Sequence, residues 1–133
     1  MHIIDHMGFP VADYERGKAF YVAALEPLGI TLVTEVGPRG TQGKVRACGF
    51  GKAGKPEFWI GNEGKTTPPL HVAFLADTRA AVRAFYDTAI KAGGRDNGLP
   101  GLRPHYHPNY YGAFVFDLDG HNVEAVCHKA EAE

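Results

Sequence analysis

The strongest constraint on the fold is an internal repeat. Residues 6–13, His-Met-Gly-Phe-Pro-Val-Ala-Asp, resemble residues 71–77, His-Val-Ala-Phe-Leu-Ala-Asp, and a stretch with Phe-Tyr follows each segment. His71 follows His6 by 65 residues, and a Phe follows each His by 14 residues. Because this offset is close to half of the 133 residues, the sequence predicts two tandem modules of one kind.

The first module is expected to contain a strand, a helix and three more strands. Its strands are predicted at residues 3–11, 30–36, 44–50 and 57–60. The helix should begin after Asp13, a residue with a good capping side chain, and end before Gly29. Phe20, Ala24 and Leu28 recur at helical spacing, which predicts the helix face that packs on the sheet.

The second module repeats this order. Its strands are predicted at residues 70–76, 95–97, 111–118 and 122–128, with a loop at residues 99–109. Asp77 or Thr78 should cap the helix, and Gly93 should stop it. Asp119-Gly120 is a strong signal for the turn between the last two strands. A side chain in this turn, such as that of His121, is expected to be exposed.

Length and composition indicate one ordinary domain at residues 1–133, built from modules at residues 1–62 and 70–128. The 14 basic and 15 acidic side chains nearly balance, which argues against nucleic acid or an anionic membrane as a partner. No apolar run approaches the roughly 18 residues of a membrane span, and the first residues lack the blocks of a signal peptide. A cytoplasmic protein is therefore expected.

A family resemblance rests on three features: the His-x-x-Phe-x-Val-x-Asp opening at His6, the Phe-Tyr helices, and Phe-Asp-Leu-Asp-Gly-His-Asn-Val-Glu at residues 116–124. Together they resemble the glyoxalase, bleomycin-resistance and extradiol-dioxygenase superfamily, whose fold is called vicinal oxygen chelate. The resemblance implies an α+β fold in which two βαβββ modules form a half-open eight-stranded barrel with the helices outside. It also implies a divalent metal, ligands on the first and fourth strands of each module, and a homodimer.

The repeat locates the four ligand positions that this resemblance implies. His6 and His71 occupy the first strands, and Glu124 lies 53 residues after His71. The equivalent residue 53 positions after His6 is Trp59, which cannot ligate a metal. The implied metal ligands are therefore His6, His71 and Glu124, and Trp59 is interpreted either as core or as an apolar wall of a substrate pocket.

Two histidines and one carboxylate leave open positions on an octahedral metal for a substrate. Iron(II), manganese, zinc and nickel all suit this set, and a vestigial site without metal is the alternative. A metal held in this way polarises two neighbouring oxygens of a substrate. Glu124 is expected to serve in catalysis as well.

The loop before residue 111 is rich in titratable and aromatic side chains, which favours binding or proton transfer. His105 or His107 is a candidate general acid–base, and Tyr111 a candidate donor to an oxyanion. The remaining candidates for substrate binding are Arg103 and Tyr110 in the same segment and Arg46, which lies 65 residues before Tyr111. The alternative is a surface loop that only covers apolar neighbours.

Two functions follow from these expectations. The first is a metal-dependent enzyme, a lyase, isomerase or ring-cleaving dioxygenase, acting on a small oxygenated molecule. The second is a metal-free protein that sequesters a small molecule such as an antibiotic. The three ligand candidates favour the enzyme, whereas Trp59 at the fourth position departs from the four-ligand glyoxalase pattern.

Overall fold

The computed structural model describes residues 3–37 and 46–131. The first module comprises β1 (Met7–Pro10), α1 (Tyr14–Leu25), the 3-10 helix η1 (Glu26–Leu28), β2 (Thr31–Val36), β3 (Ala47–Lys52) and β4 (Lys55–Gly61). The second comprises β5 (His71–Leu75), α2 (Arg79–Lys91), β6 (Arg95–Leu102), β7 (Tyr111–Phe116) and β8 (Asn122–Cys127). Both modules thus have the predicted order.

The strands form two four-stranded mixed sheets of identical topology, β1-β4-β3-β2 and β5-β8-β7-β6. In each sheet the first strand runs parallel to the fourth. Gly8 lies opposite Trp59 in the first sheet, and Ala73 lies opposite Glu124 in the second. Since both pairs are related by the 65-residue offset, the register confirms that Trp59 and Glu124 occupy equivalent positions.

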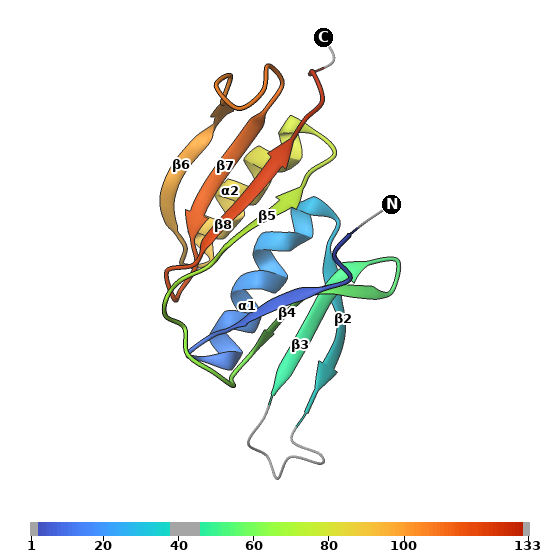
Figure 1. Cartoon of the computed structure of the whole chain (residues 1–133), viewed down its shortest axis with the longest axis vertical. Helices are drawn as coiled ribbons and strands as arrows, with labels where there is room; N and C mark the ends of the chain where they lie inside the picture. Colours follow the sequence, from blue (N-terminus) through green and yellow to red (C-terminus); the bar gives the residue numbers. More distant parts are fainter. Residues whose placement is uncertain (1–2, 38–45, 132–133) are drawn as a thin grey trace.

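Both helices cover one side of the sheets and pack against each other, and β1 and β5 are the strands nearest the centre of the molecule (Figure 1). The sheets do not close on each other, so the predicted α+β fold with a half-open arrangement of eight strands is confirmed. The most deeply buried residues lie between the helices and the sheets. Among them are Phe20 and Leu25 of α1 and Phe85 of α2. The opposite face of each sheet is left open, and its residues alternate with those of the core.

The helix caps agree with the predictions, since Asp13 accepts from the amide of Arg16 and Thr78 accepts from the amide of Ala81. The predicted first helix extended to Leu28, but α1 ends at Leu25 and one turn of 3-10 helix follows, with Pro27 near its start.

The sixth strand is longer than predicted and reaches Leu102. Its Gly and Pro residues resemble a loop, yet β6 is an edge strand, where Pro100 costs no inward hydrogen bond and bulges are tolerated. The predicted start of the third strand, Lys44, lies outside the described residues.

A buried carboxylate joins the modules. The hydroxyl of Tyr21, on α1, donates to Oδ2 of Asp117 at the β7–β8 turn, at 2.5 Å. The other oxygen of Asp117 accepts from the backbone amides of Asp119 and His121. Asp117 is 3% exposed, so these bonds offset the loss of its hydration.

His121 completes this junction, and its predicted exposure is wrong: the residue is only 1% exposed. Nδ1 accepts from the amide of Leu70, whereas Nε2 lies 3.2 Å from the carbonyl oxygen of Pro10. Its ring stacks on Phe9 at 4.0 Å between centroids. These partners identify the neutral Nε2–H form, which connects the end of β1 to the start of β5.

The junction gives the first testable prediction. Tyr21→Phe should lower the free energy of unfolding by about 1–3 kcal/mol, because it leaves a buried carboxylate oxygen without its donor. Tyr86→Phe is the matched control, since Tyr86 is the equivalent residue of α2 and its bond to Asp96 is exposed. Urea unfolding measures both; equal losses in the two variants would contradict a special role for the junction.

Candidate functional site

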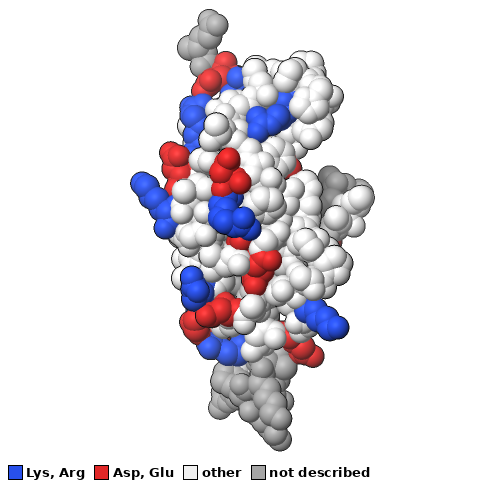
Figure 2. All heavy atoms as spheres, turned by 90° about the vertical axis from the view of Figure 1, so that its left-hand side faces the viewer, with Lys and Arg blue, Asp and Glu red and all other residues white. Residues whose placement is uncertain are grey.

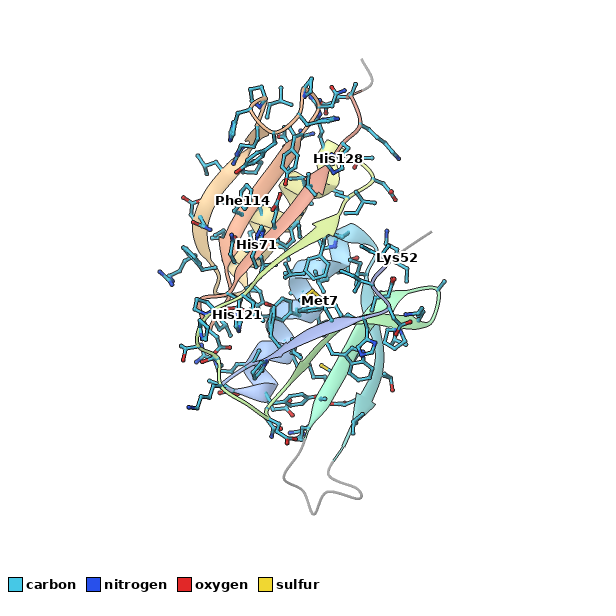
Figure 3. The ribbon with its side chains drawn as sticks, viewed as in Figure 1. Met7, Lys52, His71, Phe114, His121 and His128 are labelled. Atoms are coloured by element: carbon cyan, nitrogen blue, oxygen red, sulfur yellow. The ribbon has the colours of Figure 1, made fainter. Side chains whose placement is uncertain are left out.

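The candidate site lies on the open face of the second sheet, in the upper module of Figure 3, where His71 and Phe114 are labelled. His71 begins β5, and Glu124 is the third residue of β8. The parallel register places Glu124 opposite Ala73, two residues along the strand from His71. Since residues two apart on a strand share a face, both side chains rise from the open face.

Glu124 is the most deeply buried group of this face. Its side chain is 2% exposed, and Oε1 lies 2.9 Å from Nε2 of His71, whose side chain is 52% exposed. The hydroxyl of Tyr110 donates to the other carboxylate oxygen. The carboxylate is thus buried among polar partners that satisfy both of its oxygens.

A glycine makes room for this arrangement. A Cβ on Gly112 would lie 3.2 Å from the ring of Tyr110 and 3.4 Å from Oε2 of Glu124. A larger residue at position 112 would therefore press on both partners. Gly112 is not among the residues predicted from the sequence, although it lies only two positions after the candidate Tyr110.

Burial raises the pKa of Tyr110 well above its usual value, and the hydrogen bond to Glu124 and its negative charge act in the same direction. The phenol therefore stays a donor throughout the neutral and mildly alkaline range. Its ring contacts those of Tyr106, at 4.9 Å, and His128, at 5.3 Å. Tyr110 thus connects the carboxylate to an aromatic group above it.

That group contains the loop histidines. The ring of His107 lies 5.5 Å from that of His128, and the ring of His105 lies 4.2 Å from that of Tyr106. Nδ1 of His107 accepts from the amide of Asn109, which leaves Nε2 for a proton or a ligand. His128 was given no role from the sequence, but the structure places it in this aromatic group.

Arg103, the residue after the end of β6, borders the same face. Its guanidinium donates to the carbonyl oxygens of Gly101 and Leu99, both at 2.8 Å, and lies 5.4 Å from the ring centre of Phe114. Phe114 in turn lies 6.4 Å from the ring of His71. Arg103 is therefore held in place by the strand, with its positive charge at the margin of the site.

His6 stands apart from this pair. It bonds to its neighbour Asp5, in the segment before β1. Within residues 3–37 and 46–131, no three His, Cys, Asp or Glu side chains converge as a metal site. One chain brings together two of the three ligand candidates.

The side chains of His71 and Glu124 are both of a type that ligates divalent metals. An imidazole nitrogen and a carboxylate oxygen converge at 2.9 Å, next to an open sheet face. Tyr110 already holds the second oxygen of Glu124, in the manner of the outer hydrogen bonds that orient ligating carboxylates. The pair therefore fits as one part of a metal site that needs further donors.

Arg46 and Tyr111 lie on the other side of the sheets, toward the helices. Arg46 pairs with Glu15 at 2.6 Å, and its guanidinium lies 4.5 Å from the ring centre of Tyr14. The hydroxyl of Tyr111 accepts from Arg83 on α2. Neither side chain joins the group around Glu124.

The profile of the Glyoxalase/Bleomycin resistance protein/Dioxygenase superfamily matches residues 3–125. The chain belongs to this superfamily. No curated protein matches significantly. Among solved structures, a glyoxalase/bleomycin resistance protein from Albidiferax ferrireducens T118 has a TM-score of 0.71 and 24% identity, over 95% of this chain and 98% of that one.

Glyoxalase I from Zea mays is similar over 93% of this chain but only 45% of its own, with a TM-score of 0.69 and 24% identity. A glyoxylase/bleomycin resistance protein/dioxygenase domain from Frankia sp. EAN1pec, with a TM-score of 0.69 and 17% identity, spans 97% of this chain and 99% of that one. At these identities the similarity shows the shared fold.

In the first module, Trp59 occupies the position that Glu124 has in the second module. Its half-buried indole lies against Gly49, where a Cβ would come within 3.0 Å of the ring. A Cβ on Gly8 would lie 2.6 Å from the carbonyl oxygen of Trp59. On the open face of the first sheet, the indole of Trp59 therefore lies beside two residues without side chains, Gly8 and Gly49.

Acidic and basic side chains are interspersed over the face of the molecule in Figure 2, which agrees with the near-neutral composition. None of the helices in the described part of the chain is long and apolar enough to cross a membrane.

The contact between Tyr110 and Glu124 gives a second prediction. Glu124→Gln should lower the pKa of Tyr110 by about 1 pH unit, because it removes the adjacent negative charge. Titration of ¹³C-labelled tyrosine by NMR measures this change. Glu131→Gln, which removes an exposed charge paired with Arg83, should leave the titration of Tyr110 unchanged. An unaltered pKa in Glu124→Gln would exclude the contact in solution.

Proposed function

We propose that this superfamily member is a divalent-metal-dependent enzyme acting on a small molecule with neighbouring oxygens, as a lyase, isomerase or dioxygenase. The observation that supports this proposal most is the buried carboxylate of Glu124 beside the exposed imidazole of His71. A buried ionised group is costly, and an ordinary open sheet face has no need of one. Holding a cation is the simplest use for such a pair.

A metal bound there would polarise a substrate oxygen and stabilise negative charge as it develops. Around it, the residues of the chain have separate tasks. Glu124 orients the site and can accept a proton, while Tyr110 orients the carboxylate by donating its one hydroxyl proton to it. His107, with Nε2 uncommitted, is the candidate proton carrier at the margin.

The third ligand in this proposal is His6 of a second copy in a homodimer. The side chain of His6 is 60% exposed, and it shares the open-face position that His71 has in the second module. Leu75, on the open face of β5, is 62% exposed and would be covered by a partner. A two-fold dimer that places one copy's first sheet over the other's second sheet would build two equivalent sites.

Metal titration tests the ligand set. His6→Ala, His71→Ala and Glu124→Ala should each weaken binding of manganese, iron(II), zinc or nickel at least about tenfold. Trp59→Phe, at the position equivalent to Glu124, should leave the affinity nearly unchanged. Calorimetry on metal-free protein measures the affinities; wild-type affinity in Glu124→Ala would overturn the proposal.

Mixed dimers test the shared site. His6→Ala and Glu124→Ala chains should each lose tight metal binding alone, but a heterodimer of the two should regain one intact site. Random mixing makes half of the dimers heterodimers, so about a quarter of the wild-type sites should return. The matched control is a mixture of His71→Ala with Glu124→Ala. Each site takes both of these ligands from one chain, so every site in this mixture lacks one of them and binding should not return. Absence of recovery in the first mixture would exclude a site shared in this way.

The alternative is a metal-free binding protein for a planar small molecule. One observation favours it: Tyr110 and His71 already satisfy both oxygens of Glu124. Trp59, beside its two glycine neighbours, would offer a stacking surface for such a ligand. Metal-free protein that shows no metal affinity, but whose tryptophan fluorescence responds to aromatic ligands, would decide for this alternative.

A further inference from the structure

A second cavity lies away from Glu124, between the two modules. It measures about 470 Å³ and opens between β3 and β4 of the first sheet and β5 of the second. Its walls are mainly apolar, and the larger side chains are Met7, Ile30, Phe50, Phe58, Val72 and Phe74. This volume is within the usual range of roughly 300–1,000 Å³ for small-molecule sites.

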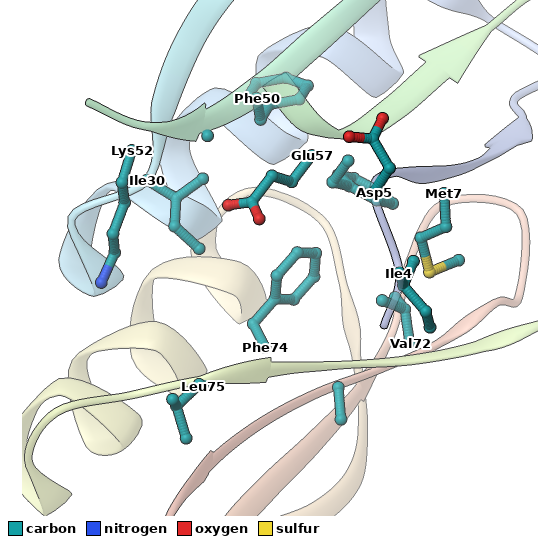
Figure 4. A pocket seen from close by; sticks show the side chains of 13 residues that line it. Ile4, Asp5, Met7, Ile30, Phe50, Lys52, Glu57, Val72, Phe74 and Leu75 are labelled. Carbon is teal, nitrogen blue, oxygen red and sulfur yellow. The ribbon is translucent and has the colours of Figure 1, made fainter. Parts of the chain in front are cut away.

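A β-bulge directs an acidic side chain into this pocket. Phe50 pairs with Phe58, but the next residue, Gly51, pairs with Pro56, so Glu57 is the extra residue of β4. Figure 4 shows its carboxylate pointing into the middle of the pocket, between Ile30 and Phe74. Bulges commonly change the direction of a side chain next to a binding site.

The bulge is built into the sequence and is specific to one module. A Cβ on Gly51 would lie 1.8 Å from the carbonyl oxygen of Lys55, so only glycine is accommodated there. In the second module, β7 and β8 pair in one unbroken register from Tyr111 to Phe116. The two copies of the repeat therefore differ at the pocket, where the first copy introduces a carboxylate.

The charges around the pocket leave Glu57 as the one without a counterion among the described residues. Asp5 is committed to Lys55 at 3.1 Å and to His6 at 2.7 Å, and these partners lower its pKa. Lys52, which also lines the pocket, lies 4.0 Å from Asp77. Glu57 has no hydrogen bond or ion pair within residues 3–37 and 46–131.

We propose that this pocket binds a small organic ammonium ion, whose apolar body lies among the phenylalanines and whose charge pairs with Glu57. The aromatic rings favour a cation as well, because their faces attract positive charge. Phe58 and Phe74, which both line the pocket, meet edge to face with 5.0 Å between their ring centroids. Neither His71 nor Glu124 lines this pocket, so the ammonium ion and the proposed metal would bind at different places.

Titration of ¹⁵N-labelled protein with 2-phenylethylammonium, in the presence of a chelator, tests this proposal. Saturable shifts are expected for the backbone amides of Phe50, Gly51 and Phe74. Glu57→Gln should weaken the binding at least about tenfold, because it removes the charge-assisted hydrogen bond from the ammonium ion to this exposed carboxylate. Asp87→Asn, which removes an exposed charge from α2, should leave the affinity unchanged.

The anion 3-phenylpropionate separates charge recognition from simple apolar binding. It has a similar body with the opposite charge and should bind at least about tenfold more weakly than the ammonium ion. Equal affinity for the two ions, an unaltered affinity in Glu57→Gln, or no saturable shift with the ammonium ion in the millimolar range would each overturn the proposal. Unfolding midpoints equal to wild type would show that the variants are folded.

Discussion

The position of the two modules relative to each other depends on one buried carboxylate. Asp117 receives the hydroxyl of Tyr21 from the first module and two backbone amides from its own turn. The second of these amides belongs to His121, whose ring then reaches Leu70 and Pro10. Because every donor and acceptor in this cluster is used, sliding one module along the other would leave buried polar groups unpaired.

This junction also determines what the open faces can do. It holds the two sheets with both helices on one side, so that the sheets expose equivalent faces on the other side. His6 and His71 are then equivalent in sequence but separated in space. The same packing that stabilises one chain thus divides the ligand candidates, and a complete site requires a second surface.

Much of this fold is predictable because the repeat relates residues 65 positions apart, so the prediction does not depend on the secondary-structure propensity of each segment. The offset from His6 to His71 gave the module order and the equivalence of Trp59 and Glu124, which the strand register confirms. The pairing of His71 with Glu124 followed from the same offset. Tyr110 could not be assigned as the donor to Glu124, because its rotation out of the loop depends on space left by Gly112.

The errors have a common physical origin. His121 was expected to be exposed because turns usually are, yet the neighbouring module buries this turn. The length of β6 was underestimated, because an edge strand tolerates the Gly and Pro residues that normally indicate a loop. Both depend on contacts between segments far apart in the chain, which a local pattern does not contain.

Each module has a contact between an arginine and a tyrosine, and the two residues exchange places between the modules. In the first module Tyr14 begins the helix and Arg46 precedes the strand, with the guanidinium 4.5 Å from the ring centre. In the second, Arg79 begins the helix and Tyr111 begins the strand, at 5.2 Å. Both residues of the second pair lie 65 positions after those of the first, in reversed roles.

This exchange makes the two halves electrically different. Glu15 and Glu35 balance Arg46, and Glu15 also lies in the first turn of α1. The first turn of α2 has no acidic residue and begins with a cation, which adds to the positive end of the helix dipole. A duplicated architecture thereby carries different charges at the two equivalent helix starts, so that a charged molecule would meet a different local environment at each.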